Sequence, residues 1–129
     1  MKTVTCNLFR DGDYIMFNIQ RLMELEAAVG KPIGELLQMP TWPINSIVSG
    51  YAIGMKHHKR NPQQYFELID DLLSKEDSDV SLLTLQAPLM KAIVASGAYG
   101  MKMYYKMFPD ELTNADKLAI DEEAEQLKN

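Results

Sequence analysis

Residues 18–32 have the clearest helix boundaries in the chain, and they constrain its fold most. Asn18 is a favoured N-cap residue, Gly30 is favoured just beyond a helix C-terminus, and Pro32 prevents the helix from resuming. Between these boundaries six apolar residues recur at helical spacing: Ile19, Leu22, Met23, Leu25, Ala28 and Val29. The polar side of this helix is predicted to carry Arg21, Glu24 and Glu26. The chain therefore contains an amphipathic helix that must bury one face.

Proline and capping residues divide the next part of the chain into short helices. Residues 33–39 form a short helical segment that Pro40 ends. Thr41 is expected to cap the following helix, with Pro43 in its first turn. Several short helices are thus expected in place of one long one.

The second half of the chain shows the same organisation. Asn61 and Pro62 are expected to be the N-cap and first residue of a helix. Ser78 or Asp79 is expected to cap the helix after it, in which Pro88 either produces a kink or starts a new helix. We therefore expect a helical second half.

Gly50 and Gly54 lie four residues apart on the predicted helix that follows Pro43. Small residues at this spacing either let a second helix approach closely or simply weaken the helix that carries them. The sequence leaves both alternatives open.

The N-terminal region favours strands instead. Residues 2–8 alternate loosely between apolar and polar side chains, and Asp11-Gly12 is a hairpin-type turn signal. Residues 14–17 are the expected return strand, and Cys6 is expected to be a small core residue of the first strand. A β-hairpin over residues 2–17 follows from this pattern.

Together these patterns predict a mainly α-helical protein, a small helical domain with a short N-terminal β-hairpin. Residues 1–112 are expected to form this single domain, because 129 residues suit one domain and 47% of them are apolar. Residues 113–129 are expected to be an acidic C-terminal helix or a frayed tail.

Charge and composition exclude several classes of function. Eighteen acidic residues outnumber thirteen basic ones, so a nucleic-acid-binding role is not expected. A single cysteine leaves no intramolecular disulfide. No apolar run approaches the roughly 18 residues that a membrane span needs, and no secretory signal is visible. We therefore expect a cytoplasmic protein that does not bind membranes.

No motif for catalysis or for a cofactor emerges. His57 and His58 are adjacent, so on a helix they would point about 100° apart, which does not suit one metal ion. A basic, solvated helix C-terminus is the expected alternative to a metal or phosphate site there. The paired acids Asp70-Asp71 and Glu122-Glu123 are expected to face water. We therefore predict no catalytic residues, no cofactor and no metal site, and hence no enzyme.

Residues 99–108 are unusual because methionine and aromatic side chains crowd into ten positions. They cannot all face one core from a single helix, so either the helix is buried on several sides or a partner covers part of it. Methionine suits surfaces that accept irregular apolar partners. The candidate protein-binding residues are Met101, Met103, Tyr104, Tyr105, Met107 and Phe108.

The first three quarters of the chain resemble a known family. Over about residues 3–97 the order of elements is similar to that of the tail assembly chaperones of long-tailed bacteriophages and prophages. In that family a helix-turn-helix of this pattern follows an N-terminal strand. The residues that carry the resemblance are Arg21, Leu22, Leu25, Glu26, Gly30, Ile33, Leu36 and Leu37.

The resemblance implies a non-catalytic assembly factor. Members of the family bind the tape-measure protein and help tail-tube subunits to polymerise around it. They commonly have a second, longer product made by ribosomal frameshifting. The resemblance therefore implies two partners for this chain, the tape-measure protein and the tail-tube protein.

An alternative is a small prophage-borne or plasmid-borne regulatory or adaptor protein that binds one protein partner. Self-association into a homo-oligomer is also compatible with the sequence, because small helical domains often cover leftover apolar surface in this way.

Overall fold

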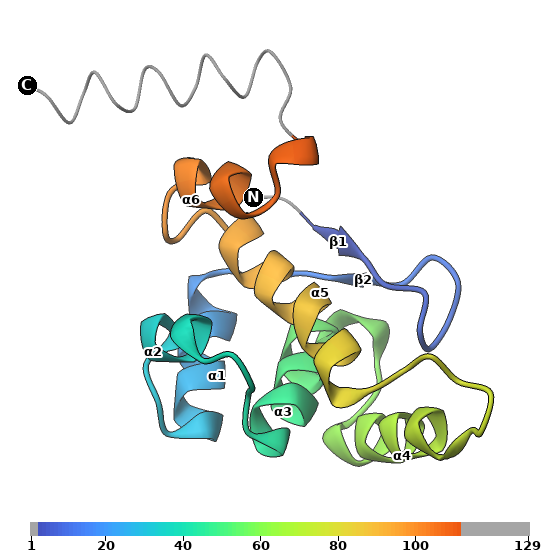
Figure 1. The fold of residues 1–129 in the computed structure, drawn as a ribbon. Coiled ribbons are helices and arrows are strands. Elements are labelled where there is room, and N and C mark those ends of the chain that lie inside the picture. The colour runs from blue at the N-terminus through green and yellow to red at the C-terminus, as the bar shows by residue number, and fades with distance from the viewer. Residues whose placement is uncertain (1–2, 112–129) are drawn as a thin grey trace, which may run out of the picture.

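The computed structural model describes residues 3–111, and it confirms a mainly helical fold with an N-terminal two-stranded antiparallel hairpin (Figure 1). The strands are β1 (Val4–Thr5) and β2 (Tyr14–Ile15). The α-helices of the described part are α1 (Ile19–Val29), α2 (Ile33–Gln38), α3 (Ile44–Gly54), α4 (Pro62–Ser74), α5 (Leu82–Ala95) and α6 (Met101–Met107). Two short 3-10 helices are η1 (Lys56–His58) and η2 (Pro109–Glu111). The predicted acidic segment 113–129 lies outside the described residues.

The hairpin pairs Val4 with Ile15 and Thr5 with Tyr14. Its strands are shorter than the pattern predicted, but the alternation is right: Val4 and Cys6 are buried while Thr5 is exposed. Two such short strands are unstable alone. Both contact α5, which supplies the surface on which the hairpin packs.

Helix α1 begins and ends where its capping residues predicted. The Asn18 side chain accepts a hydrogen bond from the backbone of Arg21, and Gly30 adopts the left-handed conformation with φ 74°. The assignment of its faces is wrong in part, because Arg21 is buried whereas Met23 is 64% exposed. Tertiary hydrogen bonds to Arg21, described below, explain this exception.

The two glycines of α3 are close-contact positions. A Cβ atom on Gly50 would lie 2.8 Å from Leu89 Cδ1 of α5. A Cβ atom on Gly54 would lie 2.8 Å from Ile15 Cγ2 and 2.9 Å from the ring of Phe17. Gly50 thus allows the close approach of a second helix, as one alternative predicted, while Gly54 allows the approach of the hairpin.

The start of α3 differs from the prediction. Pro43, and not Thr41, is the N-cap residue, and no side chain caps this helix end. Trp42 is buried instead, and its backbone N–H donates to Gln86 Oε1 of α5 over 2.8 Å. Burial of Trp42 therefore fixes the chain here in place of a cap.

Helices α4 and α5 have well-formed N-termini. Asn61 is the N-cap of α4 and Pro62 its first residue, as predicted, and Asn61 also forms a capping box with Gln64. At α5 the cap is Ser81, paired with Thr84, and neither Ser78 nor Asp79 fills that role. The helix continues past Pro88 as one element.

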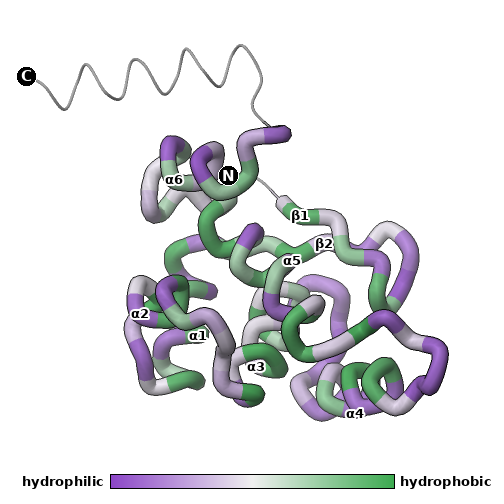
Figure 2. The backbone as a smooth tube through the Cα atoms, in the orientation of Figure 1, coloured by the Kyte–Doolittle hydropathy of each residue, from purple (hydrophilic) through white to green (hydrophobic). Residues whose placement is uncertain are grey.

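Helices α3 and α5 form the centre of the protein. They contact each other, and α1 and α4 pack on α3 (Figure 1). The second half of α5 is hydrophobic, whereas the connection between α4 and α5 is hydrophilic (Figure 2). Helix α6 packs on α5 at its C-terminal end, away from α4 (Figure 1).

Candidate protein-binding surface

Helix α6 divides the candidate binding residues into two opposite faces. At 3.6 residues per turn, positions 101, 104, 105 and 108 share one side of the helix, while positions 102, 103, 106 and 107 share the other. The first side faces the core: Tyr104 and Tyr105 are only 2% and 5% exposed, and their rings make an edge contact at 4.9 Å. Both tyrosines were candidates for the binding surface, but they belong to the core and are removed from it.

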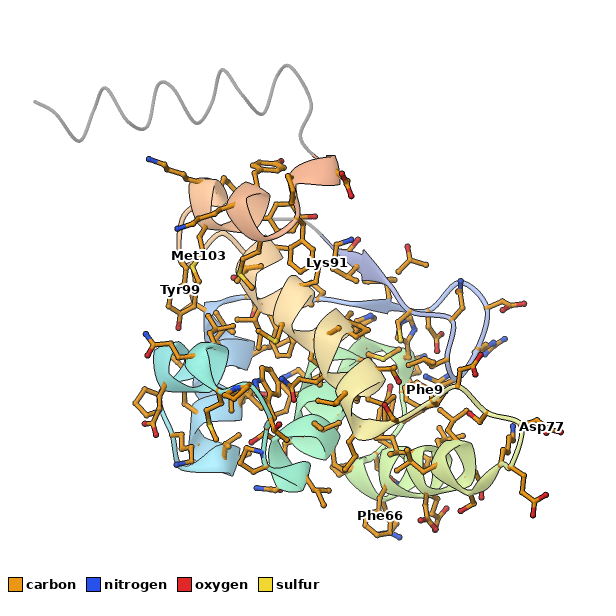
Figure 3. All side chains as sticks on the ribbon, viewed as in Figure 1. Phe9, Phe66, Asp77, Lys91, Tyr99 and Met103 are labelled. Atoms are coloured by element: carbon orange, nitrogen blue, oxygen red, sulfur yellow. The ribbon has the colours of Figure 1, made fainter. Side chains whose placement is uncertain are left out.

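The second side of α6 lines a hollow of about 660 Å³, which we call the α6 groove. Figure 3 shows Tyr99 and Met103, both of which line it, at the same end of the molecule. The full set of lining residues is Tyr99, Gly100, Lys102, Met103, Lys106 and Met107. Of the predicted candidates, Met103 and Met107 therefore share one accessible surface.

Glycines at the start of α6 shape this groove. Gly97 and Gly100 both have positive φ, 84° and 86°, a conformation that side-chain-bearing residues rarely adopt. They reverse the chain between α5 and α6, so that Tyr99 lies beside the helix that follows it. Burial raises the pKa of the Tyr99 hydroxyl, and the carboxylate of Glu26 on α1 raises it further.

Met101 and Phe108 lie apart from the groove. Met101 is half-buried against the core, as Met103 and Met107 are, but it does not line the groove. The ring of Phe108 lies 5.4 Å from Lys91 Nζ, and both residues line a different hollow, of about 460 Å³, beside β1. Met101 and Phe108 consequently support the attachment of α6 to α5, not the groove.

The sequence analysis missed the two lysines of the groove. Lys102 and Lys106 are exposed, four residues apart, and flank Met103 and Met107. Lysine at this spacing marks the solvent side of a short helix, and this signal was present in the sequence. Because α6 carries two lysines and no acid, this face of the helix combines apolar side chains with positive charge.

A second cluster of functional groups lies between the hairpin, α1 and η1. Arg21 is 7% exposed, and its Nη1 lies 3.1 Å from the carbonyl oxygen of Met16 and 3.2 Å from that of Gly54. The same nitrogen lies 2.9 Å from Nδ1 of His57. The buried guanidinium therefore joins the end of β2 to the C-terminal end of α3.

The two histidines bind the outer edge of β2. His57 Nε2 lies 3.1 Å from the carbonyl oxygen of Tyr14, and His58 Nε2 accepts the Tyr14 N–H over 3.0 Å. These are the outward-facing backbone groups of β2, beside which no third strand lies within residues 3–111. The expected basic helix C-terminus is confirmed, because Lys56, His57 and His58 form the last turn of η1, but the two rings are only partly solvated, since both contact the hairpin.

The hydrogen bonds also define the charge state of His57. Since Arg21 can only donate, Nδ1 of His57 accepts, and Nε2 carries the proton that goes to Tyr14. Burial lowers the pKa of His57, and the neighbouring His58 and Arg21 lower it further. Neutral His57 is the form that fits this site.

Asp13 completes the cluster. Its Oδ2 lies 2.8 Å from Arg60 Nη1, and its Oδ1 lies 3.5 Å from His58 Nδ1. Among residues 3–111, no group of three or more His, Cys, Asp or Glu side chains could hold a metal ion. Burial raises the pKa of the Cys6 thiol, which disfavours a nucleophilic thiolate. The contacts of this cluster join secondary-structure elements together.

Comparison with known proteins adds no relative. No family model, no curated protein and no solved structure matches this chain. Within the described residues, no helix has the length and apolar character needed to cross a membrane.

Proposed function

We propose that this protein is a non-catalytic tail assembly chaperone of a long-tailed phage or prophage. In this role it binds the tape-measure protein through the α6 groove and assists assembly of the tail tube. The observation that carries the proposal is the groove itself, in which Met103 and Met107 are accessible between two lysines. The family resemblance of residues 3–97 supplies the identity of the partners.

The residues that carry the resemblance have structural positions consistent with it. Arg21, Leu22 and Leu25 are buried in α1, and Gly30 ends that helix. Ile33 and Leu36 are buried in α2. These residues hold the helix-turn-helix together, which leaves partner binding to another surface.

The groove suits transient shielding of apolar segments. Methionine side chains are flexible and polarisable, so they fit partners of irregular shape. The lysine ammonium groups keep the rim hydrated, and they attract carboxylates on the partner at long range. Binding here would cover apolar residues of the tape-measure protein until tube subunits replace the chaperone.

Co-purification tests this proposal. Tape-measure fragments are co-expressed with the full chain, with a Met103→Ser/Met107→Ser variant and with a Met23→Ser control. Met23 is a useful control because it is exposed on α1, outside the groove. We expect the fragment to co-purify with the wild type and the control but not with the groove variant. Equal recovery with all three proteins would place binding elsewhere.

The adaptor alternative is favoured by the small size of the groove. Helix α6 has seven residues and is therefore about 10 Å long, which matches two turns of a single partner helix. If no tape-measure fragment or tube protein binds, while one helical peptide does so through Met103 and Met107, the adaptor hypothesis replaces the chaperone.

A further inference from the structure

The α6 groove is positively charged in a protein whose net charge is −5. Its two lysines are exposed, and Met103, Met107 and Tyr99 provide apolar surface between and beside them. An occupant that fits this chemistry carries acidic side chains together with a few apolar ones.

The end of this chain has that composition. Residues 112–129 contain five acidic residues and two lysines. The apolar anchors in the same stretch are Leu118, Ile120 and Leu127. The segment is therefore complementary to the groove in both charge and polarity.

The segment is also long enough to reach the groove. It follows directly after η2, which ends at Glu111, only four residues beyond the end of α6. Four extended residues span about 13 Å, which exceeds the roughly 10 Å length of α6. Residues 112–115 therefore supply enough length for the segment to turn back along a helix as short as α6.

We propose that residues 112–129 dock in the α6 groove of their own chain and cover Met103 and Met107 until a partner displaces them. Linking the segment to the groove makes docking intramolecular, so weak contacts suffice because the effective concentration is high. The docking itself needs no partner. Only its consequence, that the docked segment blocks partner binding at the groove, rests on the proposed function.

The charge pattern makes the docking sensitive to salt. Ionic contacts between exposed groups are screened beyond about 8–10 Å at 0.10–0.15 M salt, and beyond about 3 Å at 1 M. Raising the salt concentration is expected to weaken docking without unfolding the domain, which is held by its apolar core.

Methionine methyl signals report the docking in the full chain. A nitroxide label is placed on Ala124→Cys in a Cys6→Ala background, and broadening of the labelled methyl resonances is measured by NMR. We expect broadening at Met103 and Met107 but not at Met23, which lies on α1. Labelled chains are diluted tenfold into unlabelled chains, so that only contacts within one chain persist.

Charge reversal provides the matched comparison. The Lys102→Glu/Lys106→Glu variant is expected to abolish the broadening. The Lys59→Glu/Lys75→Glu control changes the net charge equally, at exposed sites away from α6, and the broadening is expected to persist in it. Absence of broadening, broadening at Met23 to the same extent, or loss of the signal on dilution would each overturn the proposal.

Partner binding separates this inference from the proposed function. Replacing Asp121, Glu122, Glu123 and Glu125 by their amides should release the groove. If the segment occupies the groove nine-tenths of the time, this variant binds a tape-measure fragment about tenfold more tightly. Broadening at Met103 and Met107 without binding of any fragment would support the docking and contradict the chaperone proposal. Fragment binding without broadening would support the chaperone proposal and contradict the docking.

Discussion

The hairpin and α6 both pack on α5, but they differ in how they are held. At the hairpin, backbone and side-chain polar groups are paired through Arg21, His57 and His58, and Gly54 lets the strand contact α3 closely. Helix α6 instead packs on α5 through one face and carries partly exposed methionines on the opposite face. The difference distinguishes a region whose polar contacts join several elements from a region that is attached through one helix face only.

The largest effect is expected from Arg21→Leu. The variant keeps a buried apolar stem but removes hydrogen bonds of a charged donor to the carbonyl groups of Met16 and Gly54. We expect the free energy of unfolding to fall by about 3 kcal/mol, as measured by urea titration. Arg10→Leu, at an exposed position, is the control and should cost far less. Equal effects would mean that the buried arginine does not hold the hairpin.

Gly54→Ala is expected to cost somewhat less. The new methyl group would lie within 2.9 Å of Ile15 and Phe17, both fully buried, so the hairpin must shift. Overpacking of this kind costs about 2 kcal/mol. Gly34→Ala is the matched control, because nothing lies near its Cβ position and alanine favours the helix. The comparison fails if thermal unfolding shows both variants to be equally stable.

Acidification is expected to weaken the hairpin end through His57. Its pKa is lowered in the folded protein, so below about pH 6.5 the unfolded chain binds more protons than the folded one. The stability that neutral His57 contributes is complete above that pH and is lost as pH falls towards its folded pKa.

The measurement is the loss of unfolding free energy between pH 7.5 and pH 5.5. We expect the loss to be smaller in His57→Gln, which cannot be protonated, than in the wild type. His58→Gln tests whether the neighbouring ring accounts for the effect instead. An unchanged loss in the His57 variant would show that this histidine does not couple pH to stability.

The smallest effect on stability is expected at the groove. Met103 and Met107 are partly exposed, so replacing either with serine should lower the free energy of unfolding by less than about 1 kcal/mol. Tyr104→Ala, on the buried face of the same helix, should cost at least about 3 kcal/mol. A large loss from the methionine variants would mean that the groove serves the fold.

Local chemistry explains which parts of this fold were predictable. Asn18, Gly30 and Asn61 act on backbone groups within four residues of themselves, so their roles follow from the sequence alone. Arg21 was assigned to the wrong face because its partners come from residues 16, 54 and 57, which only the tertiary fold brings together.

The candidate surface was predictable only in part. The crowding of methionine and tyrosine located it, but both faces of α6 are apolar enough to pack on α5. The choice of face depends on the positions of Lys102 and Lys106 and on the turn made by Gly97 and Gly100. The two lysines could be identified from the sequence. The turn could not, because the position of Tyr99 depends on the tertiary fold.

The most direct test of the account follows the methionine methyl resonances while a tape-measure fragment is added to the full chain. The account predicts that Met103 and Met107 shift with the same binding isotherm, while Met23 on α1 and buried Met55 do not. Shifts confined to Met23, or no shift at Met103 and Met107 when the fragment is bound, would contradict the claim that α6 carries the binding surface.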